Sequence, residues 1–206
     1  MTLGPALAEL AAARDELLRS TVRSARLVFK AYAASVFVFD PEHDELSLEA
    51  TSEEDADKLL NIRIKADSGI AGWAFQTGES SIVSDPGSTA QFNYDVADAT
   101  GYIPATIVAV PVENAGRILG VLEILDPAPF EDGERVMLTL AEELGRQCGA
   151  ALITLELHDP VSTAASVEQV MDRIVASVRR LGHSPRSSDV EVLAAVDLLL
   201  QAQIRP

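Results

Sequence analysis

The stretch ATIVAVPVENAGRILGVLEILD, residues 105–126, decides the fold. Two runs rich in β-branched residues, 105–113 and 117–126, flank the tripeptide Asn114-Ala115-Gly116. Glycine adopts the left-handed backbone that a tight turn requires, so this pattern predicts an antiparallel hairpin. Gly120 lies inside the second run, where a missing side chain allows another segment to approach the sheet closely.

Upstream residues supply further strands and a short helix. ASVFVFD, residues 34–40, predicts a strand that ends at an Asp-Pro turn. LSLEAT, residues 46–51, alternates strictly and predicts its antiparallel partner with one face open to water. GIAGWAFQTGE, residues 69–79, predicts a glycine-bracketed helix of about two turns with Trp73 and Phe75 as packing residues.

Longer helices surround this region. Apolar residues recur at threes and fours over 5–31 and again over 132–157, which predicts two long amphipathic helices. Residues 164–182 and 187–203 predict a C-terminal helical pair. We therefore expect an α+β fold, an antiparallel sheet with flanking helices, divided into an N-terminal helix (1–31), a central domain (32–158) and a helical extension (159–206).

Several of these strings, in this order, resemble the GAF domain family. The resemblance rests on ASVFVFD, GIAGWAFQTGE, IVSDP, the hairpin of residues 105–126 and the closing helix, and it covers roughly residues 15–157. It implies a GAF/PAS-like sheet and a sensory role in signal transduction. One such fold serves many ligands, so the resemblance names none.

Family members that bind ligands do so between the sheet and the loops on one face. Here those loops correspond to residues 85–104, a long connection of the kind that is often functional. Aromatic side chains in it could stack on a planar ligand, or could close the site as a hydrophobic lid; both readings stay open. The candidate ligand-binding residues are Phe92, Tyr94, Asp95, Asp98, Tyr102 and Thr106.

Charge limits the partners. The net charge is −16, and residues 31–160 carry six basic and 24 acidic residues. Such a domain repels nucleic acid and anionic membrane surfaces. No apolar run approaches the length of a membrane span, and the N-terminal residues do not read as a signal peptide, so we expect a cytoplasmic protein.

Patterns for catalysis and for cofactors are missing from the sequence. Cys148 is the only cysteine, so the disulfide cycle of the methionine-sulfoxide-reducing relatives cannot run within one chain. The Asn-Lys pair of cyclic-nucleotide-binding relatives is absent, and no histidine lies in residues 85–104 to ligate haem. Asp85, Asp95 and Asp98 match no known metal-binding loop. We therefore expect no enzyme activity, no cofactor and no metal.

Two functional hypotheses follow. The first is a sensory module that binds an unidentified small molecule under residues 85–104 and transmits its state through the flanking helices. The second is a ligand-free structural adaptor. In both, the N- and C-terminal helices are expected to form a homodimer, and a separate output protein is a candidate partner.

Overall fold

The computed structural model describes residues 3–53, 59–60, 62–89, 92, 101–130 and 133–156. All of these lie within Met1–Asp159, the first of two units into which the chain divides. The helical pair predicted for residues 164–203 lies outside the described residues.

The described part of the chain is built on a six-stranded antiparallel sheet with the order β3-β2-β1-β6-β5-β4. The predicted hairpin forms its centre, because β5 and β6 pair with each other and β6 also pairs with β1. Ala115 and Gly116 turn the hairpin with positive φ angles of 51° and 78°. The strands are β1 (Ala33–Asp40), β2 (Glu45–Thr51), β3 (Arg63–Lys65), β4 (Ser81–Ser84), β5 (Thr106–Asn114) and β6 (Arg117–Leu125).

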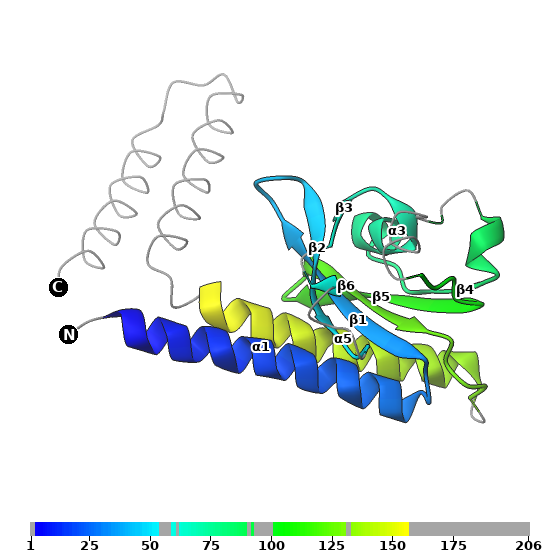
Figure 1. The fold of residues 1–206 in the computed structure, drawn as a ribbon, viewed down its shortest axis with the longest axis horizontal. Helices are drawn as coiled ribbons and strands as arrows, with labels where there is room; N and C mark the ends of the chain where they lie inside the picture. The colour runs from blue at the N-terminus through cyan, green and yellow to red at the C-terminus, as the bar shows by residue number, and fades with distance from the viewer. Residues whose placement is uncertain are drawn as a thin grey trace, which may run out of the picture. The chain divides into compact units, whose positions relative to one another are not determined.

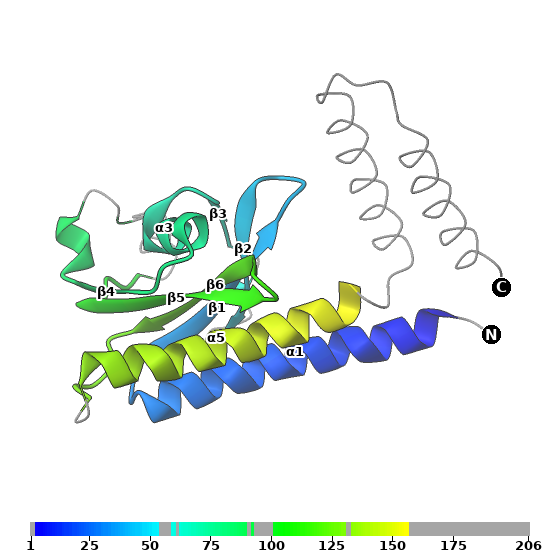
Figure 2. The ribbon, with the colours of Figure 1, turned by 180° about the vertical axis from the view of Figure 1, so that it is seen from behind.

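Helices cover both faces of the sheet. Figures 1 and 2 show α1 (Leu3–Val28) and α5 (Glu134–Glu156) side by side along one face, which we call the helix face. The short helix α3 (Gly69–Thr77) and the 3-10 turn η1 (Pro86–Ser88) lie toward the other, which we call the cavity face. This architecture confirms the predicted α+β fold. No helix in the described ranges is both long and apolar enough to cross a membrane.

Alternation along the central strands divides the core into two layers. Val108, Val110 and Val112 of β5 pack toward α1 and α5, whereas Ile107 and Ala109 belong to the layer on the cavity face. Gly149 lets α5 approach closely: a Cβ atom built there would lie 2.1 Å from the Glu113 carbonyl oxygen. Gly120 has the predicted role, since its Cβ would lie 2.0 Å from the Phe37 carbonyl oxygen.

Strand β2 corrects one expectation. It was predicted to have one face open to water, but five of its seven residues are buried and the other two, Glu45 and Glu49, are only partly exposed. The reason is α1, which covers the side that alternation assigns to solvent. Arg14 of α1 pairs with Glu49 at 2.8 Å across this contact.

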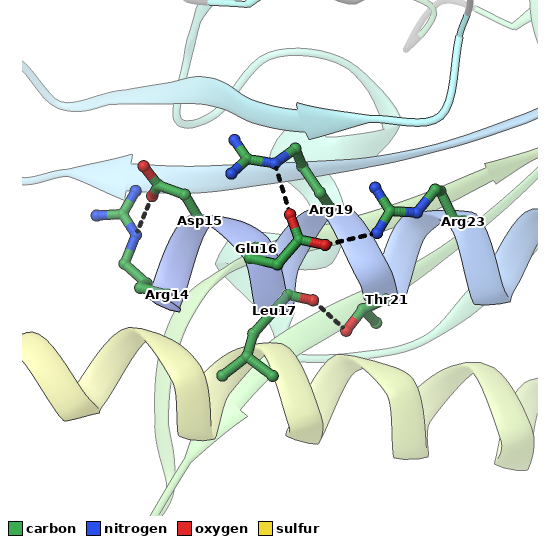
Figure 3. Close-up of polar contacts among 7 residues, drawn as sticks. All are labelled: Arg14, Asp15, Glu16, Leu17, Arg19, Thr21 and Arg23. Carbon is green, nitrogen blue, oxygen red and sulfur yellow. Dashed lines mark hydrogen bonds and ion pairs between the residues drawn. The ribbon is translucent and has the colours of Figure 1, made fainter. Parts of the chain in front are cut away.

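A cluster of ion pairs lies on the exposed surface of α1. Glu16 bridges Arg19 and Arg23, with a 2.7 Å contact to Arg23 (Figure 3). Hydrogen bonds from these guanidinium groups, first that of Arg23, lower the pKa of the Glu16 carboxyl. Exposed pairs of this kind add little to stability, so α1 is held mainly by its buried side.

Candidate functional site

A cavity of about 70 Å³ lies against the cavity face, beneath α3 and the residues that precede β5. Its lining comes from β1, β2, β3, α3, β5 and β6 and from four residues outside them, Glu53, Phe92, Tyr102 and Pro104. Most of the walls are apolar, as in small-molecule sites generally. The apolar walls include Phe37, Ile64, Ile70, Phe92, Ile107 and Leu125.

The floor of the cavity is a row of three residues, one from each of three neighbouring strands. Glu123 of β6 pairs in register with Ser35 of β1 and Ala109 of β5. Both neighbours are small, whereas the next row along the sheet holds Phe37 and Val121. A hollow therefore forms above the small residues, with the Glu123 side chain on its floor.

Glu123 is a carboxyl group in an apolar setting. It lies on a central strand, is only partly exposed, and lines the cavity. No described residue donates a hydrogen bond to its carboxylate or forms an ion pair with it. Burial disfavours the charged form and raises the pKa of Glu123 to about 7.

The remaining polar groups at the cavity are mostly acceptors. Ser35 donates its hydroxyl hydrogen to Thr51 Oγ1 at 2.9 Å, which leaves the lone pairs of Ser35 Oγ available. Glu53 also lines the cavity, and partial burial raises the pKa of its carboxyl. The site thus offers two carboxyl groups and a hydroxyl oxygen to a ligand.

Tyr102 closes one side and is held from two directions. Its ring stacks on Tyr32, with centroids 3.9 Å apart and an interplanar angle of 15°. Its hydroxyl donates to Asp126, and this hydrogen bond raises the pKa of Tyr102 to about 12. The other Asp126 oxygen accepts the backbone N–H groups of Ala105 and Thr106, each at 2.8 Å. Asp126 therefore fastens the segment before β5 to the end of β6.

Comparison with known proteins identifies the family. The GAF domain family model matches residues 13–152. The chain belongs to the GAF domain family. The match covers nearly the same residues as the predicted resemblance.

Relatives of known description are distant. A probable 3′,5′-cyclic phosphodiesterase of Caenorhabditis elegans is 25% identical over 173 residues, covering 79% of this chain. The chain spans only 23% of that protein's length.

Solved GAF structures resemble this fold at low identity. The GAF domain of a phosphoenolpyruvate-protein phosphotransferase from Coxiella burnetii is 20% identical, with a TM-score of 0.58, covering 74% of this chain and 95% of that one. Free methionine-R-sulfoxide reductase from Neisseria meningitidis, solved with its substrate, is also 20% identical, with a TM-score of 0.57. That match covers 76% of this chain and 89% of the reductase. Similarity at this level establishes the fold alone.

The structure brings two of the predicted site residues to the GAF cavity. Phe92 and Tyr102 both line it. Thr106 starts β5 one position before Ile107, so alternation directs its side chain to the opposite face, and it is not among the described lining residues. The other three predicted residues, Tyr94, Asp95 and Asp98, lie outside the described residues.

Glu123 and Glu53 were not predicted as site residues. A signal for Glu123 was present, because it is the one charged residue in the apolar run ILGVLEIL, residues 118–125. Charged residues on central strands are seldom buried without a partner or a function. Glu53 follows β2 and carries no comparable signal.

Cys148 lies away from the cavity. It is fully buried on α5 in the core on the helix face, and burial raises the pKa of its thiol to about 11. The sheet separates it from the cavity. In the described part of the chain, no group of three or more histidine, cysteine or acidic side chains is arranged to hold a metal ion.

Proposed function

We propose that this GAF domain is a non-catalytic sensory module that binds a small molecule in the cavity above Glu123. The observation that carries the proposal is the cavity itself, with apolar walls and a few converging polar groups. Tyr102, which closes one side of the cavity, is held by Asp126 and Tyr32 of the same chain, and this supports a preformed site.

Transmission would run through the sheet to the flanking helices. Glu123 lies between Leu122 and Ile124, which point to the helix face and are fully buried in the same core layer as α1 and α5 residues. A ligand that shifts β6 would therefore change the packing of both long helices. Such a shift requires a ligand whose affinity differs between two arrangements of the domain.

The position of Cys148 supports a binding role over a reductase role. A thiol on the far side of the sheet cannot contact a ligand in the cavity, and its raised pKa keeps it protonated at neutral pH. We therefore assign no covalent chemistry to the site.

A thermal-shift screen tests the proposal. Compounds from several chemical classes are tested against the wild type and against Ala71→Phe, in which a buried α3 side chain that lines the cavity is enlarged to fill it. We expect at least one class to raise the Tm of the wild type and not that of the filled variant. Circular dichroism checks that the variant folds, and Thr106→Val is the control because its side chain lies on the other face.

The adaptor hypothesis is supported by apolar side chains left exposed on the two long helices. Leu17 is 55% and Leu27 is 77% exposed on α1, and Leu140 is 39% exposed on α5. These would be contacts of a homodimer in either hypothesis. A screen in which no compound class acts on the cavity would favour the adaptor.

A further inference from the structure

Among the described residues, Glu123 has no hydrogen-bond or ion-pair partner for its carboxylate. Its two neighbours in the sheet, Ser35 and Ala109, neither pair with its carboxylate nor fill the space above it. Placing a carboxyl group on a central strand disfavours folding unless a partner compensates for the lost water. Because no described residue is that partner, we consider a ligand that supplies it.

The charges around the cavity narrow the class of ligand. The titratable side chains that line it with Glu123 are Glu53 and Tyr102, and the Tyr102 hydroxyl donates a hydrogen bond to Asp126. The cavity-lining residues of β1, α3 and β5 carry no ionisable group: they are Ser35, Phe37, Gly69, Ile70, Ala71 and Ile107. No described lining residue is cationic, so among the described residues an anionic ligand would meet two carboxyl groups and no counter-charge.

We propose that the cavity recognises a protonated amine on a small apolar body, with Glu123 and Ser35 Oγ accepting its N–H groups and the aromatic and aliphatic walls enclosing the rest. This inference rests on the proposed sensory function and specifies its ligand class. The three hydrogens of a primary ammonium match a site that offers acceptors. A hydrogen bond between opposite charges is stronger than one between neutral groups, and apolar side chains surround this one.

The pH dependence follows from the protonation state of Glu123. Its pKa of about 7 means that the group is protonated below neutrality and ionised above it. An ammonium ligand binds the ionised form, so at pH 6 binding must first release a proton. Affinity for the amine is therefore expected to rise between pH 6 and pH 8, as long as the amine stays protonated.

Calorimetric titration with three probes of one shape tests the inference on the full chain. Benzylamine, benzyl alcohol and benzoate share a ring and differ in charge. At pH 8 we expect benzylamine to bind the wild type about tenfold or more tightly than benzyl alcohol, and benzoate to bind more weakly than either. We expect E123Q to bring benzylamine and benzyl alcohol to similar affinities, whereas E113Q, a matched change outside the lining residues, keeps the preference.

The outcomes distinguish a failure of the amine assignment from a failure of the proposed sensory function. A preference for benzylamine that is lost in E123Q and weakens at pH 6 supports the inference. If benzyl alcohol or benzoate binds the wild type better than the amine and Ala71→Phe abolishes that binding, the amine assignment is wrong and the sensory function stands. If no probe binds, the amine assignment is overturned, and the thermal-shift screen then decides the function separately.

Discussion

At the scale of single residues, Glu123 gives the protein a stability that depends on pH. An acid whose pKa is higher in the folded state binds its proton more tightly there. Folding is therefore favoured at low pH, and stability declines as the pH rises from the ordinary value of 4.5 to about 7. Above pH 7 the loss in the free energy of unfolding is constant, because Glu123 is then ionised in the folded and the unfolded protein.

Glu123→Gln should remove the destabilisation that ionised Glu123 causes. We expect the variant to be more stable than the wild type at pH 8, by up to about 3 kcal/mol, and similar to it near pH 4.5. Urea unfolding at several pH values measures the difference. Glu113→Gln serves as the control, and parallel stability curves for wild type and Glu123→Gln would contradict a buried carboxyl.

Replacing Asp126 should destabilise the protein. Asp126→Ala removes the acceptor of two backbone N–H groups and of the Tyr102 hydroxyl, so we expect a loss of about 2–4 kcal/mol in the free energy of unfolding. Hydrogen exchange should show faster exchange of the Ala105 and Thr106 amides. Unchanged exchange at these two amides would mean that Asp126 does not fasten this segment.

Residue roles were only partly predictable from the sequence. Phe92 and Tyr102 could be identified because aromatic residues in a long loop require burial or a ligand. Glu123 was missed because alternation alone cannot distinguish a face that meets water from one covered by a distant helix such as α3. Thr106 was assigned to the site by its place in the chain, although strand alternation directs it to the other face.

At the scale of elements, local patterns determined most boundaries. The hairpin of β5 and β6, the strand β1 and the helices α1, α3 and α5 all appear close to their predicted ranges. These elements have strong local signals: β-branched runs, glycine stops and helical periodicity. The covered face of β2 had no local signal, because it depends on α1, which lies far away in the sequence.

Packing of α5 against β5 supplies a test at this scale. Gly149→Ala would place a Cβ atom 2.1 Å from the Glu113 carbonyl oxygen. Alanine favours helices over glycine by about 1 kcal/mol, yet we expect this change to destabilise the protein by about 1–3 kcal/mol because the helix must move outward.

Ala150→Gly, at the exposed neighbouring position, measures how much the helix propensities of alanine and glycine alone change the stability. Thermal unfolding should show destabilisation in both variants. A Gly149→Ala protein more stable than the wild type would contradict the close approach of α5 to the sheet.

At the scale of the whole molecule, the two long helices carry exposed apolar side chains. We expect a homodimer that uses the apolar side chains exposed on α1 and α5. Leu17→Glu and Leu140→Glu should each raise the dimer dissociation constant by about tenfold or more, since a charge replaces an apolar contact.

Sedimentation velocity over a range of concentrations measures the dimer. Ile103→Glu is the control, because Ile103 is 57% exposed but lies outside both helices. A wild type that remains monomeric at high concentration would remove the helix-pairing proposal and leave the cavity unaffected.

The ligand cavity above Glu123 is the central claim, and the ionisation of that one carboxyl group tests it most directly. The measurement is a carbon-13 NMR titration of the Glu123 side-chain carboxyl, first in the free protein and then with saturating benzylamine. We predict a pKa of about 7 in the free protein and a clear decrease when the amine is bound. A pKa near the ordinary 4.5 that is the same with and without benzylamine would contradict the account.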